Sequence, residues 1–247
     1  MAVDPGDQQP DGNVAHGTEV SRPVARERIA GIVLAGGQSR RMGGGDKTLL
    51  HLAGRPMLQH VIDAVRPQVA RLALNANGDA ARFAPFGLDV EPDPIDGFVG
   101  PLAGVLAGMA WARRTAPEVD HIATVSGDAP FLPADLVQRL SAALNAPAQT
   151  SQDAPPTGLS ARPRIALARS DGHLHPVIGL WPVALHDDLA AALNDGVRKV
   201  LHWTDRHGTL GVDFAMMDTG GEVIDPFFNA NKPEDLARAQ AILEAMR

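Results

Sequence analysis

The amino-acid sequence predicts a single three-layer α/β domain with a mostly parallel sheet. Short apolar runs alternate with stretches whose apolar residues recur every three or four positions, as strands alternating with helices do. Such alternation favours right-handed crossovers and a sheet covered by helices on both faces. The chain has 247 residues, of which 45% are apolar and 21% charged, and this suits one large folded domain.

Two segments differ in composition from the rest. Residues 1–27 have no apolar periodicity and several turn formers, so we expect a disordered leader before a domain at residues 28–247. Residues 145–162 consist mainly of Ala, Pro, Gln, Ser and Thr. That composition predicts a mobile insertion on the surface of the domain.

The first half of the domain repeats a strand–helix unit. Residues 28–34 are an apolar run stopped by Gly36 and Gly37, which indicates a strand buried on both faces. Pro56 predicts the start of a helix, because a proline at the first helical position loses no hydrogen bond. Further strands are expected at residues 70–74, 88–90 and 121–125, and further helices from Gly100-Pro101 onward and at 133–144.

The second half is expected to be a mixed sheet. Residues 164–168 and 174–180 have the character of strands, and Ser170-Asp171-Gly172 between them is typical of a hairpin turn. A hairpin adds antiparallel pairs to a sheet that is otherwise parallel. Helices are expected at residues 183–193, 197–204 and 233–246, and strands at 210–216 and 227–228.

Composition excludes several classes of function. The formal net charge of −7 gives no basic surface for nucleic acid, and the lack of cysteine rules out disulfides, thiolate metal sites and cysteine nucleophiles. The longest charge-free stretch, residues 98–112, is shorter than the roughly 20 residues of a spanning helix. The N-terminal residues lack the basic and apolar regions of a secretory signal. We therefore expect a cytoplasmic protein with neither nucleic acid nor membrane as a partner.

A glycine-rich loop follows the first strand. Residues 34–47 read LAGGQSRRMGGGDK and lie at the carboxyl edge, where open α/β sheets bind ligands. Glycines expose backbone N–H groups that can bind an anion, and Arg40, Arg41 and Lys47 add positive charge. The predicted ligand is a polyphosphate. The spacing matches neither the P-loop, whose lysine follows glycine, nor the dinucleotide fingerprint, which opens directly into a helix.

Polar side chains also end the other strands. The carboxamide of Asn75 can donate to and accept from a base or ribose, and Asp128 is a suitable Mg²⁺ ligand beside phosphate oxygens. Asp93 follows the strand expected at residues 88–90. All three residues have a purely structural alternative: Asn75 as a turn former, Asp128 as the cap of the next turn, and Asp93 as a solvated loop acid. His173 and His175 form no metal site without a third ligand.

The glycine-rich loop resembles the signature of nucleotidyltransferases with a glycosyltransferase-A-like, three-layer αβα Rossmann-like fold. In the form found here it is similar to the molybdenum cofactor guanylyltransferase family. DAPFLP at residues 128–133 and FNANKP at residues 228–233 support the same resemblance, which extends over residues 28–247. Ser39 and Asp46 stand where the sugar-phosphate members of the group have Gly and Pro.

The resemblance implies transfer of GMP from GTP to the terminal phosphate of molybdopterin, the organic part of the molybdenum cofactor, with release of pyrophosphate. It implies Mg²⁺ as the cofactor, and molybdoenzymes or their chaperones as further partners. The implied catalytic residues are Arg41, Lys47 and Asp128, with Asp128 also the metal ligand. The implied nucleotide-binding residues are Leu34, Ala35, Gly36, Gly37, Lys47, Asn75, Asp93 and Asp128. Asp93 would face guanine, and His175, Asn229 and Asn231 would lie on the acceptor side.

Three alternatives remain open at this point. The first is a cytidylyltransferase that acts on molybdopterin or an erythritol phosphate. The second is a sugar-1-phosphate guanylyltransferase, which Ser39 and Asp46 disfavour. The third is a partner without catalytic activity that binds GTP and inserts the cofactor into molybdoenzymes.

Overall fold

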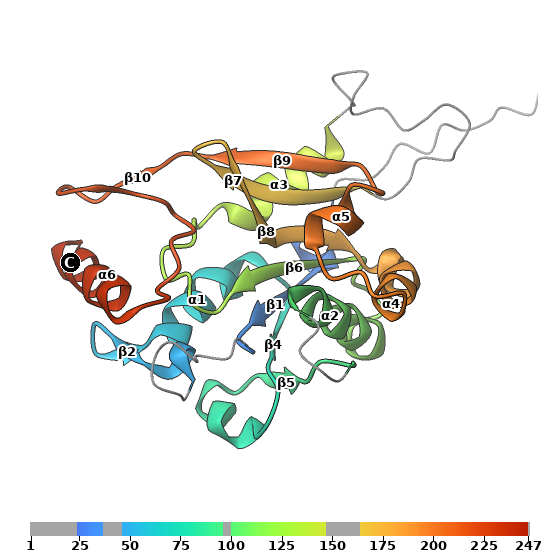
Figure 1. Ribbon diagram of the computed structural model, residues 1–247, viewed down its shortest axis with the longest axis horizontal. Coiled ribbons are helices and arrows are strands. Elements are labelled where there is room, and N and C mark those ends of the chain that lie inside the picture. The colour runs from blue at the N-terminus through green and yellow to red at the C-terminus, as the bar shows by residue number, and fades with distance from the viewer. Residues whose placement is uncertain (1–23, 37–45, 96–99, 147–163, 247) are drawn as a thin grey trace, which may run out of the picture.

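In the computed structural model, the protein is a seven-stranded mixed sheet between two layers of helices (Figure 1). The structure describes residues 24–36, 46–95, 100–146 and 164–246. The strands of this sheet, in spatial order, are β5 (Asp89–Glu91), β4 (Arg71–Asn75), β1 (Ile29–Leu34), β6 (His121–Ser126), β8 (His173–Pro182), β7 (Ile165–Ser170) and β9 (Thr209–Phe214).

Strand direction divides the sheet as the sequence predicts. β5, β4, β1 and β6 are mutually parallel, whereas β8 is antiparallel to both β6 and β7. Asp171 and Gly172, the turn between β7 and β8, both have positive φ, as a tight hairpin turn requires. The parallel half carries its carboxyl ends to one edge, so the loops after β1, β4, β5 and β6 meet there.

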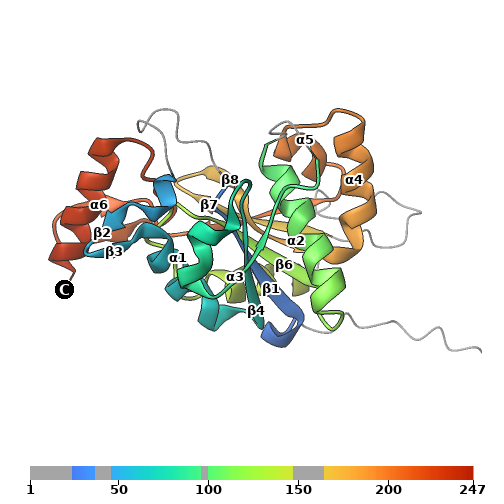
Figure 2. The same cartoon turned by 90° about the horizontal axis from the view of Figure 1, so that it is seen from below.

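Helices cover both faces of the sheet. α1 (Met57–Val65) and α3 (Leu136–Asn145) pack on one face, and α2 (Pro101–Thr115), α4 (His186–Asn194) and α5 (Val200–Thr204) pack on the other (Figure 2). β1 serves both layers, since Val33 belongs to the core under α1 and Ile32 to the core under α2. This alternation is expected of a strand buried on both sides. The predicted three-layer α/β architecture is confirmed.

A third apolar cluster joins the end of the chain to the first loop. β2 (His51–Leu52) and β3 (Arg55–Pro56) form a short hairpin before α1. Leu52 of this hairpin and Met57 of α1 share an apolar cluster with Ala239 and Ile242 of α6 (Pro233–Ala245). The hairpin lies between the glycine-rich loop and α1. The cluster brings the residues just before α6 back to the carboxyl edge of the sheet.

The remaining regular elements are short. They comprise the hairpin of β10 (Met217–Asp218) and β11 (Val223–Ile224), and the 3-10 turns η1 (Arg26–Arg28), η3 (Lys47–Leu49), η4 (Arg66–Gln68), η5 (Ala80–Phe86) and η6 (Val183–Leu185). Val24, near the end of the expected leader, accepts a hydrogen bond from Ser141 Oγ through its carbonyl, at 2.6 Å. Residues 1–23 of the expected leader and residues 147–162 of the expected insertion lie outside the described residues.

One expected strand is absent, and some boundaries shift. Phe227 and Phe228 form a turn, because the Asp225 carboxylate accepts from Phe227 N at 2.8 Å and its carbonyl from Phe228 N at 3.0 Å. The prediction of a strand at residues 227–228 was therefore wrong. The strand pairing nearby is the antiparallel pairing of β10 with β11. α3 begins at Leu136 rather than at residue 133, and Pro56 caps α1 rather than occupying its first turn. In the part of the chain that the structure describes, no helix has the length and apolar character to cross a membrane.

Candidate functional site

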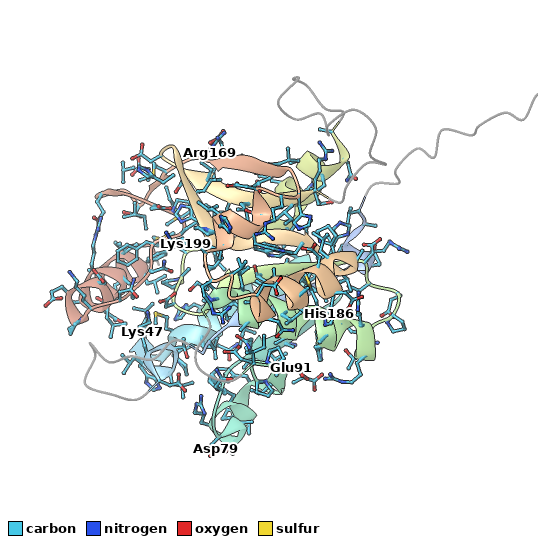
Figure 3. All side chains as sticks on the ribbon, turned by 45° about the vertical axis from the view of Figure 1, so that its right-hand side comes forward. Lys47, Asp79, Glu91, Arg169, His186 and Lys199 are labelled. Atoms are coloured by element: carbon cyan, nitrogen blue, oxygen red, sulfur yellow. The ribbon has the colours of Figure 1, made fainter. Side chains whose placement is uncertain are left out.

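Lys47 connects three distant parts of the chain at the carboxyl edge of the sheet. Its ammonium donates to Asp128 Oδ2 and, at 2.7 Å, to Asn231 Oδ1. Lys47 follows the glycine-rich loop, Asp128 follows β6, and Asn231 precedes α6. Figure 3 shows Lys47 on the side of the molecule where α6 lies. The structure thus brings together two predicted catalytic residues and one residue predicted on the acceptor side.

Asp128 is held on both of its carboxylate oxygens. Ser126 Oγ donates to Oδ1, the oxygen that Lys47 does not use. The backbone carbonyl of Asp128 accepts from Ala230 N at 3.1 Å, which fixes the segment before α6 against the turn after β6. Sequence reasoning gave Ser126 no role, although it stands two residues before the aspartate at the end of the same strand.

Asn75 and Asp93 lie together at the ends of β4 and β5. Asn75 Nδ2 donates to Asp93 Oδ1 at 2.9 Å, and Asn77 Nδ2 donates to Asp93 Oδ2 at 2.7 Å. Asn77 Oδ1 also accepts from the backbone N–H of Asp93, at 2.8 Å. Asn77 is a residue that sequence reasoning missed; the signal was the repeated asparagine in Asn-Ala-Asn.

Gly104, in the first turns of α2, is required by this cluster. A Cβ at this position would overlap the carboxamide oxygen of Asn75 and would lie 2.7 Å from Leu34 Cδ2. Asn75 is 5% exposed, so its carboxamide has little room to move aside. The glycine therefore permits the close approach between the helix and the end of β4.

The described start of the glycine-rich loop is joined to the neighbouring strands. Ala35 N donates to Asn75 O at 2.9 Å, and Leu34 O accepts from Gly127 N at 3.0 Å. Gly36 lies against the turn after β4: a Cβ placed on Gly36 would be 3.7 Å from the Cα of Ala76. Gly37 and Arg41 lie outside the described residues, and their predicted roles remain predictions.

His175, at the start of β8, is partly buried. Its Nε2 lies 2.6 Å from Ser170 Oγ and 3.5 Å from Asp225 Oδ2, and its ring packs on Phe227 with centroids 4.6 Å apart. Burial lowers the pKa of His175; the Asp225 carboxylate opposes this shift and His173 adds to it. Asn229, on the other predicted acceptor segment, has a buried Oδ1 with no hydrogen-bond partner among the residues described.

The donor set of this edge suits Mg²⁺ shared with a substrate. Among the described residues, no group of three or more His, Asp or Glu side chains could hold a metal ion on its own. Asp128 supplies one oriented carboxylate, and Mg²⁺ typically takes one or two carboxylates plus phosphate oxygens. The residues present therefore fit a magnesium ion that arrives with a polyphosphate.

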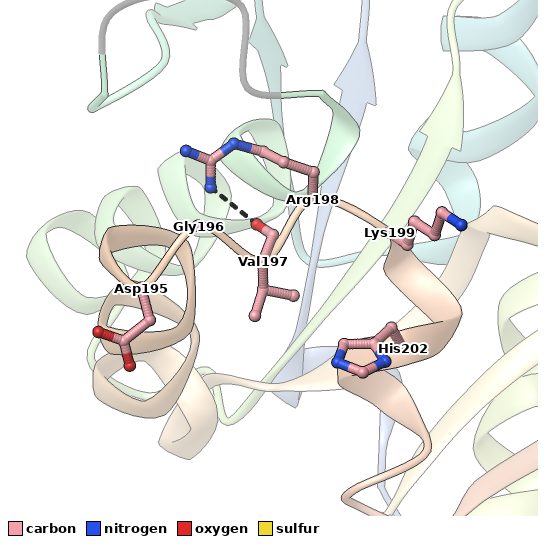
Figure 4. A pocket seen from close by; sticks show the side chains of 6 residues that line it. All are labelled: Asp195, Gly196, Val197, Arg198, Lys199 and His202. Atoms are coloured by element: carbon pink, nitrogen blue, oxygen red, sulfur yellow. Dashed lines mark hydrogen bonds between the residues drawn. The ribbon is translucent and has the colours of Figure 1, made fainter.

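A separate cavity of about 360 Å³ opens beside the N-terminus of α2 (Figure 4). It is lined by Asp195, Gly196, Val197, Arg198, Lys199 and His202. Gly100, which precedes α2, lies close to Arg198: a Cβ placed on Gly100 would be 3.8 Å from the carbonyl oxygen of Arg198. The lining carries two cationic side chains, Arg198 and Lys199, and one carboxylate, Asp195. Sequence reasoning gave its residues no functional role.

Comparison with known proteins identifies the family. Residues 31–209 match the family described as the MobA-like NTP transferase domain. The chain is 48% identical over 215 residues to the molybdenum cofactor guanylyltransferase of Bradyrhizobium sp. (strain ORS 278), a match that covers 87% of this chain and 92% of that protein. The corresponding enzyme of Rhodopseudomonas palustris (strain BisB5) is 49% identical over 212 residues, or 85% of this chain and 92% of that one.

The chain belongs to the molybdenum cofactor guanylyltransferase family. It is therefore a nucleotidyltransferase, and the resemblance seen in the glycine-rich loop is confirmed. The crystal structure of molybdopterin-guanine dinucleotide biosynthesis protein A from Archaeoglobus fulgidus superposes with a TM-score of 0.60, at 20% identity, over 88% of this chain and 100% of that one. At that identity the superposition confirms the fold expected of the family, and the individual site residues depend on the geometry described above.

Proposed function

We propose that this guanylyltransferase transfers GMP from GTP to the terminal phosphate of molybdopterin and releases pyrophosphate. The observation that carries the proposal is the position of the Lys47 ammonium, between the Asp128 carboxylate and the Asn231 carboxamide. A cation, a carboxylate and an amide at the mouth of a parallel sheet are the groups that a nucleoside triphosphate with its magnesium needs. Family membership supplies the reaction class, and the geometry supplies the assignment of roles.

The base side of the site is the cluster of Asn75, Asn77 and Asp93. A carboxylate can accept from both N1–H and the exocyclic amine of guanine, a pair of donors that adenine does not offer. Asn75 and Asn77 each donate to one oxygen of Asp93, which fixes the plane of the carboxylate. Because an ionised carboxylate offers about four lone-pair positions, these two bonds leave acceptors for the base.

The phosphate side is formed by Lys47 and the glycine-rich loop. We assign the amides of Gly36 and Gly37, together with Lys47, to the triphosphate, and Arg41 to the charge that develops toward pyrophosphate. Leu34 and Ala35 act indirectly in this arrangement, since their backbone groups join the loop to Gly127 and Asn75. Lys47 lies between the nucleotide and acceptor sides, because it contacts both Asp128 and Asn231.

Asp128 is the proposed magnesium ligand, and Ser126 orients it through Oδ1. When bound, Mg²⁺ would neutralise phosphate charge and stabilise the leaving pyrophosphate. The other contributions come from the chain. Lys47 and the glycine amides hold the triphosphate so that the acceptor phosphate meets the α-phosphorus in line. A phosphate monoester has a second pKa of about 6, so the attacking oxygen needs no general base at neutral pH.

The acceptor side comprises Asn229, Asn231 and His175. Asn231 lies at hydrogen-bond distance from Lys47. Asn229 precedes it in the same segment, and its buried Oδ1 has no hydrogen-bond partner among the described residues. We place molybdopterin here, and we propose the cytoplasm as the compartment and molybdoenzymes or their chaperones as the recipients of the product.

Pyrophosphate release measured with each of the four nucleoside triphosphates, with and without molybdopterin, tests the function. We expect release with GTP and molybdopterin together, its abolition by EDTA, and a product whose mass equals molybdopterin plus GMP. Preference for CTP would identify a cytidylyltransferase. Release with mannose 1-phosphate in place of molybdopterin would identify a sugar-phosphate enzyme. Tight GTP binding without any release would indicate a partner that only inserts the cofactor.

A further inference from the structure

Arg82 lies between the two halves of the proposed nucleotide site. It belongs to η5, and its Nε donates to the carboxylate of Asp46, the residue immediately before Lys47. We propose that Arg82 is a positioning residue, which fixes the phosphate-binding Lys47 relative to the cluster that binds guanine. This inference rests on the proposed function for the identity of the ligand.

Every nitrogen of the Arg82 guanidinium has an acceptor. Nη1 donates to Asp79 O at 2.5 Å and Nη2 donates to Asn77 O at 2.6 Å, while Nε is used by Asp46. The side chain of Arg82 is 29% exposed and that of Asp46 is 15% exposed. Three of the five N–H groups of Arg82 are therefore used by the chain, and through these bonds Arg82 acts on the residues that contact the nucleotide.

The local backbone is shaped to receive this guanidinium. The Arg82 Cζ lies 4.5 Å from the centre of the Phe83 ring, and Phe83 is fully buried. Gly78 has φ of +83°, and a Cβ there would lie 3.3 Å from Nη1. A larger residue at position 78 would be strained and would crowd the guanidinium, so glycine is suited to this turn.

The contacts form a continuous path across the site. Asn77 offers its backbone carbonyl to Arg82 and its carboxamide to Asp93. Asp46 takes the Nε bond and precedes Lys47, whose ammonium reaches Asp128. One planar guanidinium therefore sets the separation between the guanine-binding carboxylate and the phosphate-binding ammonium. Lysine offers a point charge on a flexible stem and cannot hold three acceptors in one plane.

Removal of this connection has an asymmetric consequence. Asp93 keeps its three hydrogen bonds with Asn75 and Asn77 when Arg82 is replaced, so binding of the base and ribose should persist. Lys47 keeps its bonds to Asp128 and Asn231 but loses the anchor on the preceding residue, Asp46, so the contacts made to the triphosphate in the transition state should weaken. A misplaced electrostatic contact of this kind lowers turnover more than it lowers binding of the remote part of the substrate.

The test compares Arg82→Lys, Asp46→Asn and the double variant with the wild-type protein. We expect each single variant to lower kcat/KM for GTP by about 10-fold or more, and the double variant to fall no further, since one connection is broken in each. The affinity for guanosine, measured by calorimetry, should stay within about twofold of wild type. Arg139→Ala is the matched control: Arg139 lies 4.2 Å over the ring of Phe214, away from the site, and donates to Asp213 O.

Wild-type kcat/KM in Arg82→Lys would overturn the proposal. Additive losses of kcat/KM in the double variant would also overturn it, since they would show that Arg82 and Asp46 act independently. An equal loss of guanosine affinity, or an equal loss of kcat/KM in Arg139→Ala, would indicate general destabilisation instead. The wild-type assay separates this question from the proposed function. If the wild-type protein transfers no GMP, the function fails, and the ratio of GTP affinity to guanosine affinity in the same variants still decides the role of Arg82.

Discussion

The ammonium of Lys47 donates to the carboxylate of Asp128 in the interior of the site, where the two side chains are 14% and 11% exposed. A cation thus already occupies the oxygen that the chain would offer to magnesium. With Asp128 as the proposed magnesium ligand, Lys47 and the divalent ion would compete for its carboxylate unless phosphate oxygens draw the ammonium away. We therefore infer that binding of the nucleotide phosphates would free Asp128 for the metal ion.

Replacement of Lys47 should have opposite effects on metal binding and on turnover. In Lys47→Met the Asp128 carboxylate loses its internal cation, so we expect tighter Mn²⁺ binding to the nucleotide-free protein. Turnover should fall by at least roughly 100-fold, the scale of one lost preorganised electrostatic contact. Paramagnetic titration with Mn²⁺ measures the first effect, and pyrophosphate release measures the second.

Asp128→Asn should lower both metal affinity and turnover, because it removes the proposed metal ligand itself. Arg169→Met is the control: it breaks the ion pair of Arg169 with Asp213, in which two bonds of 2.6 Å join β7 to β9. We expect this variant to keep wild-type metal binding and turnover. Unchanged Mn²⁺ affinity in Lys47→Met would show that the ammonium does not compete for Asp128.

Asp93→Asn should reduce the preference for GTP over ATP. The substitution removes one acceptor for guanine and places an amide donor against the donor of Asn75 or Asn77, which now meet the carboxylate at 2.9 and 2.7 Å. The ratio of kcat/KM for GTP to that for ATP measures the effect. Asn77→Ser is the matched control, because it deletes the two bonds between the Asn77 carboxamide and Asp93 and keeps the carboxylate. Wild-type discrimination in Asp93→Asn would exclude Asp93 as the group that reads the base.

Local periodicity was sufficient to predict the helices and the edge of the sheet that carries the site. The spacing of the apolar residues after Pro56 puts them on one face of α1, and burial of a helix face follows directly from such spacing. All five are buried: Met57, Leu58, Val61, Ile62 and Val65. Asn75, Asp93 and Asp128 lie at one edge of the sheet for a similar reason: the carboxyl ends of parallel strands share that edge. These relations need no knowledge of which side chains touch.

Contacts between distant segments could not be predicted in this way. Arg82 and Asp46 are 36 residues apart, and no pattern in the sequence gives the direction of either side chain. Asn231 could cap α6 or reach the site. The structure places its carboxamide on Lys47, while the Asp235 carboxylate accepts from the backbone N–H of Asn231 at 3.0 Å. The apolar pair Phe227 and Phe228 predicted a strand. Apolar composition alone does not reveal the turn that Asp225 makes with these two residues.

Gly104→Ala should damage the nucleotide site, whereas Gly108→Ala should affect only stability. Both glycines lie on α2 against the sheet. A Cβ at Gly104 would overlap the carboxamide of Asn75, and a Cβ at Gly108 would lie 2.5 Å from Ile32 Cγ1 in the core. Overpacking of this kind typically costs about 1–3 kcal/mol. Guanosine affinity by calorimetry and thermal melting separate the two effects. Equal guanosine affinity in the two variants at equal stability would contradict the role given to Gly104.

His175 should make the fold less stable in mild acid. Because burial lowers its pKa in the folded protein, protonation favours the unfolded chain, in which histidine titrates near pH 6.5. The stability contributed by neutral His175 is therefore fully present above about pH 6.5 and is lost as the pH falls through and below that value. Asp225, 3.5 Å away, reduces the effect, and His173 adds to it.

Melting temperatures from pH 8 to pH 5 test this expectation. The wild-type protein should lose stability over the lower part of this range, and His175→Gln should lose less, since the titrating group is gone while a polar side chain remains beside Ser170. His51→Gln removes an exposed histidine without altering the contacts of His175, and it controls for the loss of any imidazole. A decline in His175→Gln as steep as that of the wild type would place the acid sensitivity elsewhere in the fold.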